Sequence, residues 1–191
     1  MDSEQSLEQC ALDWIADYSQ AEHLVRTRDW VIELEPGARE AVRLAALTHD
    51  IERRVPGGPE QDRAGTAWDD ADYLRAHCER SAEIVGSWLR GEGADAALVS
   101  DVEALVRAHE LGGSPSADLL QAADSISFLE TLSEVVVGWV RDGVCSAEKA
   151  KEKHAWMHDR IRLARARVLA LPYYEAALAA IDREVVALQA R

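Results

Sequence analysis

The stretch PGAREAVRLAALTHDIER, residues 36–53, carries the strongest information about the fold in this sequence. Its apolar side chains recur at intervals of three and four residues, which is the spacing of a helix that buries one face. A proline is tolerated in the first turn of a helix because its missing N–H has no partner there anyway. The stretch therefore predicts a core helix from Pro36 to about Ile51, with His49 and Asp50 near its C-terminal end.

The same helical spacing continues along the rest of the chain, and residues that cap helices fall between the apolar runs. Ser19 and Glu22 have the spacing of a capping box, and Pro172 is expected to start the last helix. No segment shows the strict alternation of a half-buried strand. The sequence predicts an all-α protein, with the other helices at about residues 5–18, 19–34, 70–89, 95–109, 115–140, 146–170 and 173–190.

The length of 191 residues suits one domain with its own core. No internal repeat, low-complexity tract or linker divides the chain, so we expect a single domain over residues 1–191. Residues 56–67 hold two prolines and three glycines and form the only long irregular connection that the pattern predicts. Connections of this kind often cover a functional site, so this one is a candidate lid.

The charge balance limits the partners. Lys+Arg 21 against Asp+Glu 35 gives a formal net charge of -14, which disfavours nucleic-acid polymers because the overall field repels polyanions. No run approaches the roughly 18 apolar residues of a membrane span, and the first ten residues lack the pattern of a leader. Three scattered cysteines without a CxxC indicate reduced thiols. We expect a cytoplasmic protein with no membrane partner; the sequence leaves its oligomeric state open.

Histidines and aspartates form an ordered set along the predicted helices. The chain has two His-Asp pairs, at 49–50 and 158–159, and such a pair alone is weak evidence of function. Only the first pair has a histidine on the preceding helix, one histidine on each of the next two helices, and an aspartate on the helix after those. The full set is His23, His49, Asp50, His77, His109 and Asp124.

This order resembles the HD-domain superfamily of metal-dependent enzymes, and the resemblance covers about residues 19–130. Three local stretches carry it: AALTHDIER at 45–53, HCERSAEIVGSWL at 77–89 and LVRAHELGGSPSADLLQAADSISFLE at 105–130. The resemblance implies an HD-type helical bundle on which the helices of about residues 146–190 pack. Within the superfamily, the set is similar both to bacterial hydrolases of dinucleoside polyphosphates and to mixed-valent diiron oxygenases related to myo-inositol oxygenase.

The resemblance implies one or two divalent metal ions per chain. Histidine and carboxylate ligands together favour Fe, Mn, Co, Ni or Zn over calcium. By the family pattern, four residues would hold one ion, and two more would hold a second, with Asp50 bridging both. The first group is His23, His49, Asp50 and Asp124, and the second is His77 and His109.

The activity implied is hydrolysis of a small phosphate ester, such as a nucleotide or dinucleotide, by a metal-activated hydroxide. Asp50 and Arg53 are the expected catalytic residues; Arg53 stands where the family's phosphohydrolases commonly have a lysine. Two alternatives stay open: a diiron oxygenase that uses the same ligands, and a non-catalytic regulatory module that binds a metal.

Four basic residues are candidates for binding the small anionic substrate: Arg53, Arg80, Lys153 and His154. Arg80 lies one turn after His77, and the other two belong to the basic stretch of residues 149–167. That stretch is interpreted either as a phosphate-facing wall or as a core helix with a solvated face. Glu110 is interpreted as a surface carboxylate at a helix end, or alternatively as a partner that orients a metal-bound imidazole.

Overall fold

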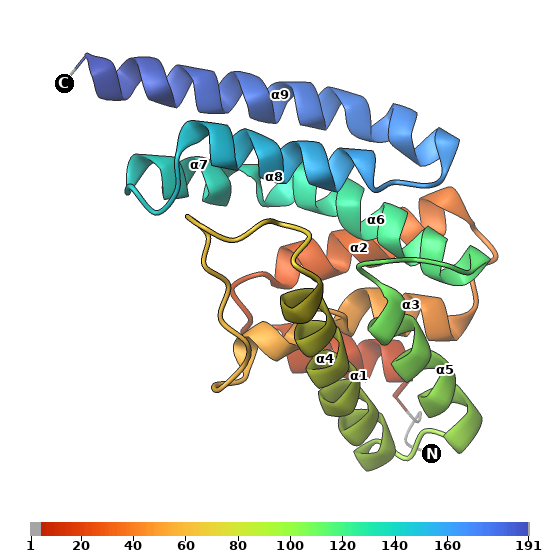
Figure 1. Ribbon diagram of the computed structural model, residues 1–191. Coiled ribbons are helices and arrows are strands. Elements are labelled where there is room, and N and C mark those ends of the chain that lie inside the picture. The colour runs from red at the N-terminus through yellow and green to blue at the C-terminus, as the bar shows by residue number, and fades with distance from the viewer. Residues whose placement is uncertain (1–4, 191) are drawn as a thin grey trace.

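The computed structural model describes residues 5–190, and within them every regular element is a helix. The predicted all-α class is confirmed. Figure 1 shows the order of the elements along the chain. They are α1 (Leu7–Ile15), α2 (Ala21–Leu34), α3 (Glu40–Thr48), the 3-10 helix η1 (Ile51–Arg54), α4 (Ala71–Gly91), α5 (Ala96–Ala108), α6 (Pro115–Thr131), α7 (Ser133–Arg141), α8 (Ala147–Asp159) and α9 (Ala164–Gln189).

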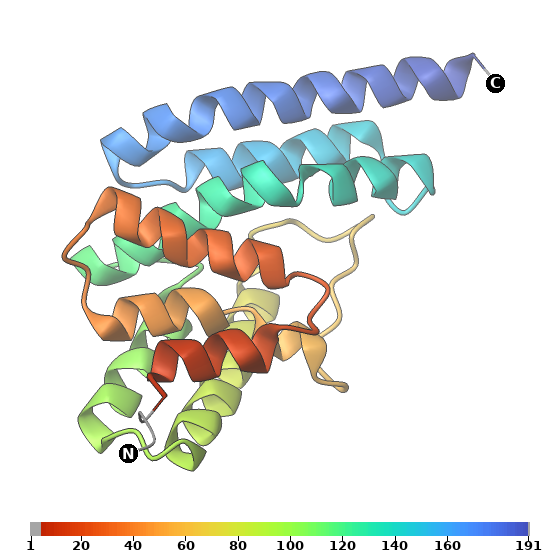
Figure 2. The same cartoon turned by 180° about the vertical axis from the view of Figure 1, so that it is seen from behind.

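The helices form successive layers, which Figures 1 and 2 show from opposite sides. The long helix α9 runs along one edge and packs on α6, α7 and α8. Helix α6 also packs against α2, which in turn packs against α3. Helices α1, α4 and α5 close the opposite end, where α3 contacts both α1 and α5. The central helices α2, α3 and α6 therefore each pack against several others, and the residues on their inward faces are shielded from water.

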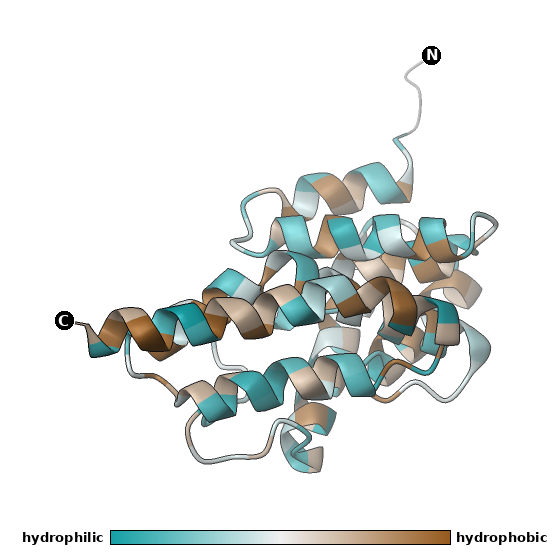
Figure 3. Cartoon of the chain, turned by 90° about the horizontal axis from the view of Figure 1, so that it is seen from above, coloured by the Kyte–Doolittle hydropathy of each residue, from teal (hydrophilic) through white to brown (hydrophobic). Residues whose placement is uncertain are grey.

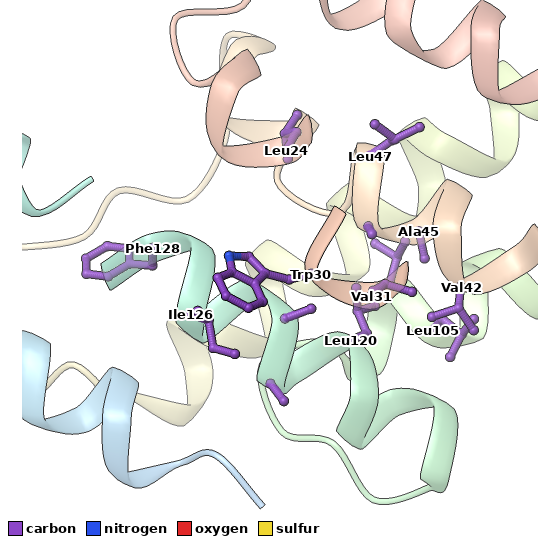
Figure 4. Packing of buried hydrophobic residues seen from close by; sticks show 14 of the residues in the cluster. Leu24, Trp30, Val31, Val42, Ala45, Leu47, Leu105, Leu120, Ile126 and Phe128 are labelled. Atoms are coloured by element: carbon purple, nitrogen blue, oxygen red, sulfur yellow. The ribbon is translucent and has the colours of Figure 1, made fainter. Parts of the chain in front are cut away.

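The core between these layers is aliphatic. Leu24, Leu44, Leu47, Leu120 and Ile126 have no exposed surface, and burial of each such side chain stabilises the fold by about 1.5–3 kcal/mol. Figure 4 shows part of this cluster between α2, α3, α5 and α6. The apolar spacing of the sequence thus brings the three central helices together, and the same packing determines where their polar residues lie.

Two predicted helix starts are wrong. Helix α2 begins at Ala21, and no side chain caps it. The backbone N–H of Ala21 instead donates to the carbonyl of Tyr18, in a turn that joins α2 to α1. Helix α3 begins only at Glu40. Pro36 instead lies in a turn that the backbone N–H of Ala38 closes on Glu35, a position for which the fixed φ of proline is equally suitable.

Two predicted long helices are divided differently in the structure. The predicted helix at 115–140 breaks at Leu132, where Ser133 Oγ donates to the carbonyl of Leu129. Helix α8 ends at Asp159, and α9 begins at Ala164 and continues through Pro172, which was expected to start it. The division after Asp159 follows from a side-chain cap, since the guanidinium of Arg167 binds the carbonyl oxygens of Asp159 and Ile161.

The predicted irregular connection is present between η1 and α4, and it is attached to the α7–α8 side of the molecule (Figures 1 and 2). The indole N–H of Trp68 donates to the carbonyl of Lys149 at 2.9 Å, and the Trp68 ring stacks on Trp139. The guanidinium carbon of Arg63 lies 4.6 Å from the centre of the Trp139 ring. The connection, residues 55–70, is called the covering loop below.

Helix α9 keeps several apolar side chains in solvent, including Val168, Leu171 and Val186, and Figure 3 shows these apolar segments along the helix. None of the helices in the described part of the chain has the length and hydropathy needed to cross a bilayer. Cys10, Cys78 and Cys145 are free thiols.

Candidate metal centre

The fold brings all six residues of the predicted ligand set into one buried cluster. Each of four histidines comes from a different helix, and none of the six residues is more than 8% exposed. Such burial is costly for ionisable groups unless they are paired or bind an ion. The six are His23 on α2, His49 at the C-cap of α3, Asp50 after it, His77 on α4, His109 at the C-cap of α5, and Asp124 on α6.

Three overlapping groups of these side chains have ligand atoms that all lie within 4.8 Å of one another. Each group combines residues from at least two helices or helix ends that are distant in sequence, so helix packing brings its members together. One group contains Glu110, which the sequence did not suggest as a ligand. Among the described residues the groups are His23, His49 and Asp124; His49, Asp50 and His109; and His77, His109 and Glu110.

Two of the histidine rings are oriented by the helix ends on which they lie. Nδ1 of His49 lies 3.0 Å from the carbonyl oxygen of Ala46, and Nδ1 of His109 is close to the carbonyl oxygen of Val106 at 2.6 Å. Carbonyl groups in the last turn of a helix lack an intrahelical partner, so they accept from these rings. A carbonyl can only accept, and both rings therefore carry a proton on Nδ1 and leave Nε2 directed at the cluster.

The other two histidines are oriented by side chains. Ser127 donates its hydroxyl hydrogen to the carbonyl of His23 at 2.8 Å, so it accepts from Nδ1 of the same residue at 2.9 Å. Nδ1 of His77 lies 2.7 Å from a carboxylate oxygen of Glu52, which is 3% exposed. Hydrogen bonds of this kind are characteristic of metal-binding histidines, because they fix the ring and make Nε2 more basic.

All four Nε2 atoms face carboxylate oxygens. Those of His23 and His49 lie 3.2 and 3.4 Å from Oδ1 of Asp124, and that of His77 lies 2.9 Å from Oδ1 of Asp50. Nε2 of His109 is 3.8 Å from the same Asp50 oxygen. The lone pairs of imidazole nitrogens and carboxylates repel each other unless a proton or a metal ion lies between them.

The Nε2 atoms of His49 and His109 are buried without a hydrogen-bond partner among the described residues. Buried polar atoms of this kind are rare in proteins and need an explanation. A divalent transition-metal ion satisfies imidazole lone pairs and carboxylate charges together, so the donor set fits such an ion.

The acid–base properties of the cluster agree with this chemistry. Burial opposes ionisation of Asp50 and Asp124, yet Arg53 holds the pKa of Asp50 well below its usual range and Arg160 does the same for the pKa of Asp124, each with help from neighbouring histidines. Burial lowers the pKa of His109 to about 4, which keeps its ring neutral. Both carboxylates are therefore charged and ready to bind a cation.

Without a bound cation, the aspartates favour the protonated form of two of the rings. Burial lowers the pKa of His49 and His77, but Asp124 next to the first ring and Asp50 next to the second outweigh burial, so both pKa values are raised. A metal ion that binds these rings has to displace those protons.

Sequence reasoning missed Arg160 and misplaced Glu110. Arg160 comes from the turn after α8; its guanidinium binds Glu110 and Asp124, and its Nε lies 2.8 Å from Ser125 Oγ. Glu110 is 7% exposed, so the interpretation as a surface carboxylate is wrong. Its Oε1 lies 3.8 Å from Nε2 of His109, which places it beside the histidine cluster. Burial opposes its ionisation, but Arg160 lowers its pKa.

A pocket of about 600 Å³ opens beside the cluster, and its walls include Asp50 and Asp124. The covering loop forms one wall, and residues of α6, α7 and α8 form the opposite wall. Two of the four predicted substrate-binding residues, Arg53 and Lys153, line it.

The remaining two lie elsewhere. Arg80 donates to the carbonyl oxygens of Val55 and Pro56, and so holds the start of the covering loop. His154 is fully buried between helices, where its ring nitrogens lie near the carbonyl of Ala150 and Ser133 Oγ. Neither side chain lines the pocket at the cluster.

Lys153 is a cation without a carboxylate partner in the described structure. Its Nζ lies over aromatic rings, 4.4 Å from the centre of Trp156, 5.1 Å from Phe128 and 5.3 Å from Trp68. Burial lowers the pKa of Lys153 to about 7, although the negative charge of Glu110 acts in the opposite direction. An anion that enters the pocket would stabilise the charged form and gain an ionic partner.

Comparison of this chain with protein families, with curated proteins and with solved structures gives no match. The assignment of the site therefore depends on its own geometry: four imidazoles with Nε2 directed inward, two or three carboxylates, and an adjoining pocket with an unpaired ammonium group.

Proposed function

We propose that this protein is a metal-dependent phosphohydrolase of the HD type that cleaves a small phosphate ester. The observation that carries the proposal is the position of the unpaired Lys153 ammonium in the wall of the same pocket that reaches Asp50 and Asp124. One cavity is thus lined both by basic side chains that can bind an anion and by candidate ligands for divalent ions. Phosphoryl transfer requires both kinds of group.

Two ion positions are supported by the donor groups. His23, His49 and Asp124 form one, and His77 and His109 with Asp50 form the other, for Fe, Mn, Co, Ni or Zn. Glu110 lies within reach of the second position. When bound, divalent ions supply an activated water and neutralise charge on the phosphoryl oxygens.

The chain's own residues would hold the ester in place. Arg53 is itself held by Asp50 Oδ2 at 3.1 Å and by the hydroxyl of Tyr73 at 3.1 Å, so its remaining N–H groups are presented to the pocket in a fixed direction. Lys153 would bind a second phosphoryl oxygen as an ammonium ion. With a pKa near 7 it could also release a proton to the departing alkoxide.

The oxygenase alternative needs the same ligands. We favour hydrolysis because the pocket joins the ligand cluster to two basic residues, Arg53 and Lys153, a combination that suits a phosphate ester. The two are separated by their products, since a hydrolase releases inorganic phosphate and an oxygenase consumes dioxygen.

The test is release of phosphate from a panel of phosphate esters by protein loaded in turn with Mn(II), Co(II), Fe(II) and Zn(II). We expect turnover with at least one ion and a loss of at least 100-fold in Asp50→Asn. The matched control is Asp142→Asn, an exposed aspartate after α7, which should keep full activity. Absence of phosphate release by every loaded form, or equal activity in Asp50→Asn, would refute the proposal; oxygen uptake by the iron form would favour the oxygenase.

A further inference from the structure

The pocket extends beyond the metal cluster along α6 and α7, and its walls there change from polar to apolar. Six side chains form this extension, which we call the apolar arm. They are Phe128, Leu132, Val135, Val136, Trp139 and Met157.

Helix periodicity explains the direction of the arm. Asp124, Phe128 and Leu132 follow one another at intervals of four residues and line the same side of α6. At 1.5 Å per residue, the first and last are about 12 Å apart along the helix. Figure 4 shows Phe128 on α6 at a distance from the aliphatic cluster around Val31 and Leu120. The pocket thus extends from the candidate metal ligands to Leu132 and continues along Val135, Val136 and Trp139 of α7.

The arm offers hydrocarbon surface and almost no hydrogen-bonding groups. Among its six side chains the only polar hydrogen is on the indole of Trp139. The covering loop lines the same pocket with Val55, Pro56 and Pro59 and also with polar Glu60, Gln61 and Arg63, so the apolar surface of the arm belongs to α6, α7 and α8. Val135 is 45% exposed although it is apolar, so part of the arm is left open to a ligand. A sugar placed here would lose water from its hydroxyl groups with few replacements.

The charged groups beside the arm also suit a flat apolar ligand. Arg63 lies over the face of Trp139, and Lys153 lies over the face of Phe128. These contacts place the two charged groups against aromatic rings, so a ligand in the arm meets cations at its edge.

We propose that the apolar arm binds the organic part of the substrate, and that this part is an aromatic or similarly sized hydrocarbon group instead of a sugar. The proposal rests on the proposed function, because it assumes that the phosphoryl group lies at the metal cluster. The substrate class is then a phosphate monoester of an aryl, arylalkyl or comparable apolar alcohol.

Binding of phosphonates, which cannot be hydrolysed, tests the inference without any turnover. We expect the metal-loaded protein to bind benzylphosphonate at least about tenfold more tightly than methylphosphonate in calorimetric titrations, because the ring buries apolar surface in the arm. A phosphonate with a polyhydroxylated chain of similar size should show no such gain.

A pair of matched variants locates the effect. Val135→Asn should reduce the preference for benzylphosphonate by roughly three- to tenfold. Val168→Asn should leave the preference unchanged, since Val168 is 71% exposed on α9 and does not line the pocket. Both sites are exposed, so neither variant is expected to unfold the protein.

The outcomes separate the two proposals. If the benzyl preference is absent, if the hydroxylated phosphonate binds as tightly, or if both variants behave alike, the assignment of the arm is wrong even when esters are hydrolysed. If the preference is present and sensitive to Val135→Asn while no ester is hydrolysed, the arm is a binding site for apolar groups and the proposed function fails.

Discussion

The carboxylate of Glu52 lies 2.7 Å from Nδ1 of His77, and Nε2 of the same ring lies 2.9 Å from Oδ1 of Asp50. The imidazole is thus held between a buried carboxylate that orients it and a carboxylate of the ligand cluster. Glu52 also limits the covering loop, because a Cβ atom added to Gly58 would collide with Oε1 of Glu52. One buried glutamate therefore connects the orientation of a predicted metal ligand with the path of the loop beside the pocket.

Replacement of Glu52 should weaken metal binding. Glu52→Gln keeps the size of the side chain but removes the negative charge that makes the imidazole of His77 more basic, and we expect metal affinity to fall by about tenfold or more. Titration with Mn(II) or Co(II) measures the change. The control is Glu83→Gln on the exposed side of α4, for which no change is expected. Equal affinities in the two variants would show that Glu52 does not act through His77.

Arg160 should be essential for stability. It binds Glu110 and Asp124 in the interior, so Arg160→Met would remove the guanidinium shared by two buried carboxylates and cost about 3–5 kcal/mol of unfolding free energy. Urea denaturation of the metal-free protein measures this. Arg162→Met, two residues away in an exposed ion pair with Asp118, should cost at most about 1 kcal/mol.

A double variant checks the cause of that loss. Adding Glu110→Gln to Arg160→Met removes one of the two carboxylate charges that shared the guanidinium, so part of the lost stability should return. If the stability losses of the two single variants simply add in the double variant, the ion pair between Arg160 and Glu110 is not the source of the stability.

The metal-free protein should become less stable as the pH rises above about 6.5. The raised pKa values of His49 and His77 mean that the folded state binds protons more tightly than the unfolded state. This contribution is complete below the unfolded value of about 6.5 and is lost as the pH passes through the raised folded values. His109 acts in the opposite direction only below that range, because its pKa is lowered to about 4.

Melting temperatures of the metal-free Lys153→Met variant between pH 6.5 and 8.5 test this expectation. The variant is needed because Lys153, whose pKa is lowered to about 7 in the folded state, acts in the opposite direction over the same range. Each 1 kcal/mol of lost stability corresponds to a decrease of about 2–4 °C for a protein of this size. Protein saturated with metal should show a much smaller decrease, since the ion replaces the protons. A metal-free Lys153→Met variant whose melting temperature rises over this range would contradict the raised pKa values of His49 and His77.

Lys153 should contribute mainly to binding of the anion. Lys153→Met keeps the aromatic contacts of the stem but removes the charge, and we expect the Kd for inorganic phosphate to rise by about tenfold. Lys151→Met is the control, because Lys151 pairs with Asp182 at the surface. Should both variants bind phosphate like the wild type, the pocket would have no phosphate site at Lys153.

The helical class could be predicted from sequence because it depends on local spacing, whereas the candidate ligand set was implied by the resemblance of its His and Asp order to the HD-domain superfamily. Apolar residues three and four apart are sufficient to indicate helices, and His49 and His109 lie at the ends of such helices. The breaks at Leu132 and before Ala164 could not be found this way, since side-chain contacts with carbonyl groups determine them.

The residues that orient the cluster were largely hidden in the sequence. Arg160 is 36 positions from Asp124, and only the packing of α8 on α6 brings them together. Two signals were available: Glu52 comes two residues after Asp50, and Ser127 lies one turn after Asp124 on the same helix. Both are polar residues at positions where the helical pattern requires burial, which is a usable sign of a partner in the interior.

The number of metal ions bound per chain tests the central claim most directly. After chelation and reloading with Mn(II), Co(II), Fe(II) or Zn(II), elemental analysis of the desalted protein should give about two ions per chain for at least one metal, because we propose that the overlapping donor groups hold two ions. Replacement of His109 by Gln should remove at least one of them. A wild-type protein that retains no stoichiometric ion after reloading with each of these metals would contradict the account.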